Sequence, residues 1–385
     1  MTLDARDALI AWSAIAEPGD AVAGALVESW GPGAALEWVI QGCDRLASEA
    51  ARLAESAGPE LARSAARAHE RWAARLDRRD EPHERRARAV GARVVTREDA
   101  EWPGVLGSLG QVQPFALYVR GDASIEGAWE ASVAVVGSRS ATSYGSYMAG
   151  EIAGGVADAG RAVVSGGAYG IDAAAHRAAL SQQGLTIAVM AGGIDRLYPA
   201  GNDELLKEIV GSGAVVSEVP PGFAPHRSRF LSRNRLIACA SVTVVVEAAH
   251  RSGALSTARH AAELVRPVAA VPGPVTSASS AGCHALIRDG VAVLVTDASE
   301  VLELAASLTE VAVDVGAPAL PSQSGPLEFG SLGERRMFDA LTRRAKASDA
   351  AAAAAGMTSD DARAALGALE MTGLAERHRG GWRRA

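Results

Sequence analysis

Short apolar runs alternate with helix-length segments from Ser132 to about residue 300, and this alternation constrains the fold more than any other feature of the sequence. Strands that read as continuous apolar runs are typical of a parallel sheet covered by helices on both faces. We therefore predict an α/β fold with a doubly wound, Rossmann-like, mostly parallel sheet. The predicted strands are Val133 to Val136, Ala162 to Val164, Thr186 to Met190, Ala214 to Val216, Val242 to Val246, Val268 to Val271 and Val291 to Val295.

The chain is 385 residues long, which predicts more than one domain. Residues 1–95 are rich in Ala, Leu, Glu and Arg and are broken by Gly and Pro, so we expect a small helical domain there. The α/β domain is predicted to span residues 96–310. Gly, Pro and Ser accumulate in residues 311–330, which predicts a linker, and residues 331–385 hold three helix candidates and a tail typical of a winged-helix-like domain.

The formal net charge of −7 excludes a protein that coats nucleic acid by bulk attraction, so any phosphate site must be a local patch of cations. Three widely spaced cysteines indicate neither a disulfide framework nor a zinc site, and we expect no cofactor. No segment has the length and apolarity of a membrane span, and charged residues occupy positions where a signal peptide would be apolar. We therefore expect a cytoplasmic protein that does not associate with membranes.

A candidate phosphate loop follows the first predicted strand, where Gly137-Ser138-Arg139 leads into a helix that begins near Tyr144. Glycine permits a tight turn whose amide groups and helix N-terminus face an anion, and an arginine adds a bidentate clamp. The spacing matches neither Gly-x-Gly-x-x-Gly nor a Walker A loop, so it specifies neither a dinucleotide nor a nucleoside triphosphate. A purely structural strand-to-helix connection is the alternative.

The next strand end repeats the pattern with Ser165-Gly166-Gly167, followed by Asp172 and His176 in the next helix. Paired glycines let a ligand approach the backbone closely, and Asp172 is placed to cap the helix. Two interpretations of Asp172 and His176 stay open: a helix cap with a hydrogen-bonded histidine, or a pair of catalytic residues.

The most basic stretch runs from His226 to Arg235 and contains no acidic residue. Its arginines are Arg227, Arg229, Arg233 and Arg235, which flank Phe230 and Asn234. Arginines beside one aromatic ring predict a surface that neutralises phosphates and stacks on an unpaired base. The alternative is that Arg233 and Arg235 pair with carboxylates such as Glu218 and Glu247, and we expect a mixture of the two roles.

A further loop after a predicted strand, from Ser252-Gly253 to Thr257, also opens a helix. Ligands of open α/β sheets bind outside the carboxyl ends of the strands, where all of these loops emerge. Their convergence predicts one ligand site. Because neither a Ser-His-Asp arrangement nor a Gly-x-Ser-x-Gly elbow is visible, we expect a binding protein and not an enzyme.

In chain order, these motifs resemble the DNA-processing protein A family (DprA, also called Smf). The resemblance is strongest over roughly residues 101–300. It rests on Gly137-Ser138-Arg139, Ser165-Gly166-Gly167-Ala168 with Gly170-Ile171-Asp172 and His176, Tyr198-Pro199 with Asn202, Ser217-Glu218, Phe230 with Arg233-Asn234-Arg235, Glu247, Ser252-Gly253 with Thr257, and Val271-Pro272-Gly273. Two positions depart from the family: Leu231 stands where proline is usual, and Ala200 where a basic residue is frequent.

The resemblance implies a single-stranded-DNA-binding protein that protects incoming DNA and loads the RecA recombinase during natural transformation and recombination. It also implies a SAM-like N-terminal domain and a homodimer formed through the α/β domain. The family's backbone-gripping arginine falls on Arg139, and its basic segment falls on residues 226–235. With the loop residues above, the predicted nucleic-acid-binding set is Gly137, Ser138, Arg139, Ser165, Gly166, Gly167, Arg227, Arg229, Phe230, Arg233, Asn234, Arg235, Ser252, Gly253 and Thr257.

The alternative function is a hydrolase that releases a base from a nucleoside monophosphate, because such enzymes have a similar sheet and similar phosphate loops. They carry a Pro-Gly-Gly-x-Gly-Thr stretch with a nearby catalytic glutamate. This chain has Ser252-Gly253-Ala254-Leu255-Ser256-Thr257 in that place. The difference disfavours hydrolysis.

Overall fold

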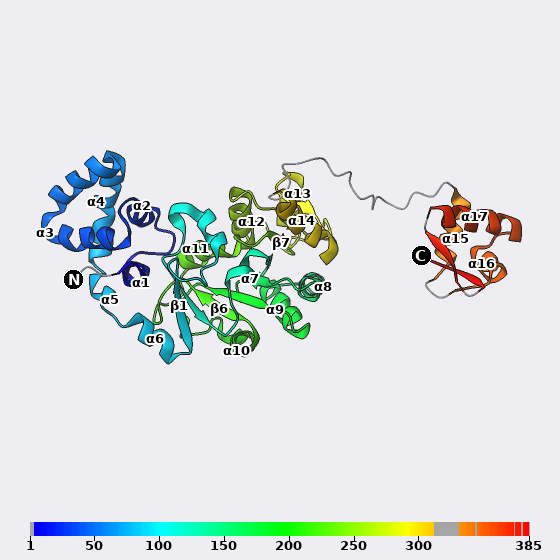
Figure 1. Cartoon of the computed structure of the whole chain (residues 1–385), viewed down its shortest axis with the longest axis horizontal. Coiled ribbons are helices and arrows are strands. Elements are labelled where there is room, and N and C mark those ends of the chain that lie inside the picture. The colour runs from blue at the N-terminus through cyan, green and yellow to red at the C-terminus, as the bar shows by residue number, and fades with distance from the viewer. Residues whose placement is uncertain (1–3, 312–330, 343–344, 373, 379, 385) are drawn as a thin grey trace. The chain divides into compact units, whose positions relative to one another are not determined.

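The computed structural model describes residues 4–311, 331–342, 345–372, 374–378 and 380–384. The chain divides into two compact units, Met1–Asp314 and Val315–Ala385. In Figure 1 the first runs from blue to yellow and the second is orange to red. The predicted linker at 311–330 lies, apart from Val311, outside the described residues.

Nine strands of the first unit form one sheet in the order β1-β2-β6-β5-β4-β3-β7-β8-β9. Only the pairings of β1 with β2 and of β2 with β6 are antiparallel. All seven predicted strands are confirmed, and the two antiparallel strands are additional. The strands are β1 (Ala92–Thr96), β2 (Ala116–Arg120), β3 (Val133–Val136), β4 (Val163–Ser165), β5 (Thr186–Met190), β6 (Ala214–Ser217), β7 (Val242–Val245), β8 (Val268–Ala270) and β9 (Val293–Leu294).

Helices cover both faces of the sheet, which confirms the doubly wound fold. Side chains alternate along each strand, so that Val133 and Val135 pack on one face while Ala134 and Val136 pack on the other. The first face is covered by α8 (Ser143–Asp158), α9 (Ile171–Ser181), α10 (Asp203–Ser212) and α14 (Ala298–Val311). The second is covered by η1 (Gly104–Val112), α7 (Glu126–Glu130), α11 (Arg227–Ile237), α12 (Ala254–Glu263) and α13 (Ala281–Arg288).

The strand order reverses at β3, which lies between β4 and β7. From β3 the chain builds the sheet outward through β4, β5 and β6, and it then returns through α11 to place β7 on the other side of β3. The loops that follow β3 and β7 therefore diverge to opposite faces at neighbouring strand ends. Such a topological switch point is where open α/β sheets bind ligands.

The N-terminal helices form a core of their own against the sheet. Trp12 lies edge-on to Trp72 with ring centroids 5.4 Å apart, and it stacks on Phe115 at 5.7 Å, just before β2. Because β1 begins at Ala92, the sheet starts inside the range predicted to be helical. The helices are α1 (Ala5–Ile15), α2 (Ala21–Trp30), α3 (Pro32–Ala57), α4 (Pro59–Ala73), α5 (Leu76–Arg79) and α6 (His83–Ala89); η2 (Ala200–Asn202) follows β5.

The described residues of the second unit form three helices and an antiparallel hairpin around a small core. Met337, Leu366, Leu369 and Trp382 are buried together in it. The elements are α15 (Leu332–Ala340), α16 (Ser348–Ala355), α17 (Ser359–Met371), β10 (Ala375–His378) and β11 (Gly381–Arg384). This is the element content predicted for residues 331–385. Among the helices the structure describes, none combines the length and apolarity needed to cross a membrane.

Candidate functional site

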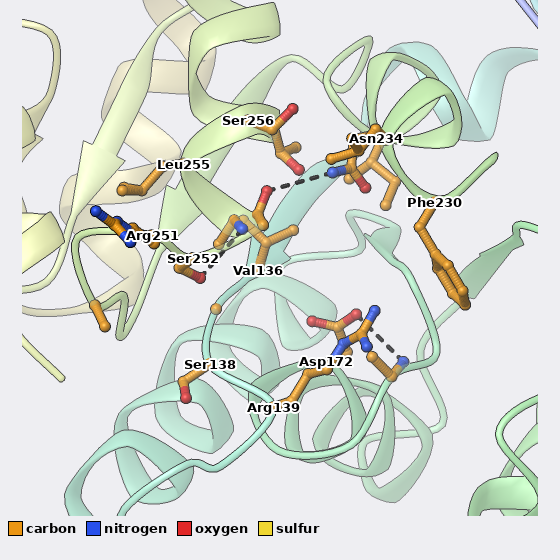
Figure 2. A pocket seen from close by; sticks show the side chains of 18 of the residues that line it. Val136, Ser138, Arg139, Asp172, Phe230, Asn234, Arg251, Ser252, Leu255 and Ser256 are labelled. Atoms are coloured by element: carbon orange, nitrogen blue, oxygen red, sulfur yellow. Dashed lines mark hydrogen bonds between the residues drawn. The ribbon is translucent and has the colours of Figure 1, made fainter. Parts of the chain in front are cut away.

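A pocket of about 1130 Å³ lies at the switch point of the sheet. Its walls are the loop after β3, one side of α11, and the loop after β7 with the first turns of α12. Figure 2 shows Phe230 and Arg251 on opposite sides of it, with Ser138 and Arg139 on the loop between. The predicted convergence of loops at this edge is thus confirmed for the loops after β3 and β7.

Glu247, at the end of β7, holds the loop after β3 in place. Its carboxylate accepts hydrogen bonds from the Thr142 amide (2.9 Å) and hydroxyl (2.6 Å), and its carbonyl accepts one from the Ser138 amide (2.7 Å). A Cβ at Gly137 would lie 2.6 Å from Ile171 Cγ1 and 2.9 Å from the Glu247 carbonyl, so this position requires glycine. Glu247 thus fixes the backbone of the loop after β3 and does not pair with an arginine of α11.

Arg139 leaves this fixed loop as an exposed cation. Its guanidinium lies 5.0 Å from the centroid of the Phe230 ring, a cation–π distance. It has no ion-pair partner within the part of the chain that the structure describes. The guanidinium is therefore positioned by an aromatic ring while its donors stay available to an anion.

The arginines of α11 divide into two groups. Arg227 is exposed and lines the pocket, together with Phe230, Arg233 and Asn234. Arg235 instead makes a buried, bidentate pair with Glu218, at 2.7 and 2.6 Å. Arg229 bonds Glu17 of the N-terminal region at 3.1 and 3.0 Å. The alternative of internal ion pairs therefore holds for Arg235, with Glu218 as anticipated. It does not hold for Arg233, whose partners are backbone carbonyls, and the pair of Arg229 with Glu17 was not anticipated.

Arg233 is buried beneath the pocket although it contributes to the lining. Its guanidinium donates to the Gly166 carbonyl at 2.9 Å and to the Val189 carbonyl. Burial lowers the pKa of Arg233 to about 10. A Cβ at Gly166 would lie 2.6 Å from this guanidinium, so glycine is needed there to admit Arg233 and not a ligand.

Ser165, Gly166 and Gly167 are buried and do not line the pocket, although Ala168 of the same loop does. Ser165 donates to the Val135 carbonyl at 2.7 Å. Asp172 accepts from the amides of Gly166 (3.1 Å) and Ala168 (3.3 Å), so it caps this loop and not the helix, whose N-cap is Gly170. Burial raises the pKa of Asp172 above its usual range.

His176 is fully buried. The Thr186 hydroxyl donates its one proton to the Val163 carbonyl (2.8 Å). The same hydroxyl oxygen therefore accepts a hydrogen bond from Nδ1 of His176, at 2.7 Å. Burial, reinforced by the nearby Arg233, lowers the pKa of His176 to about 3. A neutral, buried imidazole that does not reach the pocket supports the structural interpretation and not the catalytic one.

The wall after β7 contains cations that the sequence analysis missed. Ser252, Gly253 and Thr257 line the pocket as predicted, and Arg251 and Arg259 flank them with exposed side chains. Arg251 directly precedes Ser252-Gly253, so its place beside a loop glycine was a usable signal. The N-terminus of α12 adds its own partial positive charge to this wall.

The pocket is therefore strongly cationic within an acidic chain. Its exposed arginines are Arg139, Arg227, Arg251 and Arg259, and Asp172 is the one acidic residue of its lining. No group of His, Cys, Asp and Glu suited to a metal ion occurs in the described ranges. Such a site is built to hold a phosphate-bearing ligand by charge and hydrogen bonding.

Comparison with known proteins gives a consistent result. The family model described as DNA recombination-mediator protein A matches residues 93–306. The putative DNA processing protein DprA of Mycobacterium tuberculosis is 42% identical over 383 residues, which is 96% of this chain and 92% of that protein. Protein Smf of Escherichia coli is 42% identical over 49% of this chain and 50% of its own length.

Two solved structures share the fold. The X-ray structure of DprA from Streptococcus pneumoniae has a TM-score of 0.54 and 32% identity, and covers 70% of this chain and 91% of that one. A solved structure of DprA from Helicobacter pylori, described as giving insight into its single-stranded DNA binding mode, has a TM-score of 0.50 and 28% identity. It covers 57% of this chain and 98% of that one. With the family match over more than half of its length, the chain belongs to the DNA recombination-mediator protein A family.

Proposed function

We propose that the chain binds single-stranded DNA along the pocket at the switch point. The observation that carries this proposal is the set of four exposed arginines, Arg139, Arg227, Arg251 and Arg259, that line one pocket in a chain of net charge −7. The pairing of Arg139 with Phe230 supports it, and so does the single-stranded DNA binding mode for which the related Helicobacter pylori structure was determined.

In this proposal the exposed arginines neutralise successive phosphates, and the ring of Phe230 stacks on an unpaired base. The backbone at Gly137 and Gly253 lines the pocket, and Ser138, Ser252 and Thr257 offer hydroxyl groups to the strand. Asn234 ties the walls together by donating to the Gly253 carbonyl at 3.3 Å. Ser165, Gly166, Gly167, Arg229, Arg233 and Arg235 support the site from beneath or beside it.

Fluorescence anisotropy with labelled oligonucleotides tests this proposal. Single strands are expected to bind more tightly than duplexes, and Arg139→Ala to weaken binding. Arg85→Ala, which removes an exposed arginine on α6, is the matched control and is expected to bind as the wild type does. Equal affinity of wild type and Arg139→Ala for the single strand would refute the proposed site.

For the cellular role, we propose that the protein protects incoming DNA and loads the RecA recombinase during natural transformation and recombination. The description of the family as a recombination mediator supports this step. It predicts faster assembly of RecA filaments on single strands, and slower nuclease digestion of those strands, when the protein is present. Unchanged rates in both assays would restrict the role to DNA binding.

The assembly proposed is a homodimer formed through the α/β domain. In the sequence, this domain follows the helical (SAM-like) region and precedes the winged-helix-like domain. Strand β9 supports it, because β9 is an edge strand on which Val293 is 53% and Leu294 46% exposed. Val293→Arg should halve the mass measured by light scattering. Val275→Arg, at another exposed valine, is the control and should leave the mass unchanged.

We further propose that the protein is not an enzyme. The burial of His176 and the loop-capping role of Asp172 support this, because neither group is free for proton transfer in the pocket. Chromatography after incubation with nucleoside monophosphates tests it. Release of a free base would establish the hydrolase alternative instead.

A further inference from the structure

Two exposed tyrosines lie next to the proposed DNA site and outside the pocket. Tyr169, in the loop after β4, is 47% exposed, and Tyr198, in the loop after β5, is 46% exposed. Neither belongs to the lining of the pocket. Both rings are thus accessible at adjacent strand ends, where an unpaired base can stack on them.

Contacts connect both rings to the site. The ring of Tyr198 lies 5.9 Å from that of Phe230, which in turn lies under the Arg139 guanidinium. The hydroxyl of Tyr169 accepts a hydrogen bond from the Gly201 amide at 3.1 Å, in the loop that carries Tyr198. Arg139, Phe230 and Tyr198 therefore contact one another in series, and Tyr169 is joined to the loop of Tyr198 through Gly201. We call these four residues the row.

The row is held rigidly. Asn202 is buried, and its side-chain amide donates to the carbonyls of Gly167 (2.9 Å) and Ala168 (3.0 Å), which fastens the loop after β5 to the loop after β4. A Cβ at Gly201 would lie 2.6 Å from the Tyr169 hydroxyl and 2.9 Å from its ring, so glycine leaves room for the tyrosine side chain against this loop. Preorganised rings lose little entropy when a ligand binds.

We infer that Tyr169 and Tyr198 form a base-stacking ledge that extends the DNA site beyond the pocket. The inference rests on the proposed function: phosphates are held by the arginines of the pocket, and bases that leave it stack on the two rings. Because a ring needs an unpaired base, the ledge favours single strands over duplexes. It also lengthens the site without adding positive charge.

The test compares a normal oligonucleotide with one of equal length whose bases are replaced by abasic residues, which keeps the phosphates. Replacing both tyrosines by leucine removes the rings but keeps apolar bulk, and Tyr169→Phe with Tyr198→Phe keeps the rings. The leucine pair should weaken binding of the normal strand by at least about 5-fold. The salt slope should stay unchanged, as should binding of the abasic strand; the phenylalanine pair should bind like the wild type.

Controls separate this inference from the proposed function. Tyr147→Ala removes a tyrosine that is 62% exposed on α8 and outside the row, and it should have no effect. If the wild type bound no single strand, the proposed function itself would fail. Two results would refute the ledge alone, provided that Arg139→Ala weakened binding. In the first, the leucine pair binds the normal strand as the wild type does; in the second, it binds the abasic strand and the normal strand more weakly to the same extent. If the leucine pair misfolds, Tyr198→Leu takes its place in the same binding test, because no hydrogen bond is described for the Tyr198 side chain. It should also weaken binding of the normal strand and not of the abasic strand.

Discussion

Arg227 and Arg235 lie two turns apart on the same helix, yet they serve different regions of the molecule. Arg227 is exposed on the pocket wall, whereas Arg235 is enclosed with Glu218, each side chain being 5% exposed. Arg229 and Arg233 resemble Arg235, because Glu17 and backbone carbonyls occupy their donors. A basic stretch of sequence is therefore not a basic surface: the partner of each guanidinium determines whether it stabilises the fold or remains available to a ligand.

The largest effect on stability is expected when the buried arginine of this comparison is removed. Arg235→Ala leaves the Glu218 carboxylate buried without its partner, which should lower the free energy of unfolding by about 3–5 kcal/mol. Urea unfolding measures this. Arg227→Ala is the matched control and should stay within about 0.5 kcal/mol of the wild type. A small effect of Arg235→Ala would mean that water reaches the pair.

Arg139→Ala should have the opposite profile. Loss of one charge-assisted phosphate contact is expected to weaken single-strand binding about 10-fold or more. The unfolding midpoint should not move, since Arg139 has no ion-pair partner among the described residues. Anisotropy and urea titrations on the same preparation measure both. Loss of stability in parallel with affinity would show that Arg139 holds the loop and not the strand.

The buried layer should also respond to pH. The pKa of His176 is about 3 in the folded state, well below its ordinary value, so below about pH 6.5 only the unfolded chain takes up the proton. Stability contributed by the neutral imidazole is present above pH 6.5 and is lost by about 1.4 kcal/mol per unit as the pH falls toward 3. His176→Gln should reduce this slope in urea unfolding at pH 7 and 5.5. The slope of the wild type must exceed that of the variant.

The smallest effect is expected from Arg251→Gln, on the wall after β7. Removing one phosphate contact should reduce the slope of log affinity against log salt by about 0.7 for a single strand. The free energy of unfolding should not change, because Arg251 is exposed. If Arg251→Gln kept the salt slope of the wild type, the wall after β7 would not contact the DNA.

Much of the fold was predictable because parallel strands that are buried on both faces consist of continuous apolar residues. Strands β1 and β2 were missed, since antiparallel strands at the edge of the sheet carry arginines such as Arg93 and Arg120 within them. The loop after β3, which lines the pocket, was singled out by its glycine and arginine at a strand end. Arg251 was missed although it precedes a loop glycine.

The sequence does not show which arginines of α11 are buried with partners and which stay exposed. Glu17 is separated from Arg229 by 212 positions, and nothing local indicates that they pair. The carbonyls of Gly166 and Val189 that hold Arg233 are likewise supplied by distant strands. Which cations stay exposed is decided by tertiary packing, which periodicity and spacing do not encode.

The most direct test of that division is the salt dependence of single-strand binding by a variant in which Arg139, Arg227, Arg251 and Arg259 are all replaced by glutamine. If these exposed arginines hold the strand, the salt slope should fall by about 3 in total while the unfolding midpoint stays unchanged. A variant that kept the wild-type slope would show that the strand binds elsewhere and would contradict the proposed site.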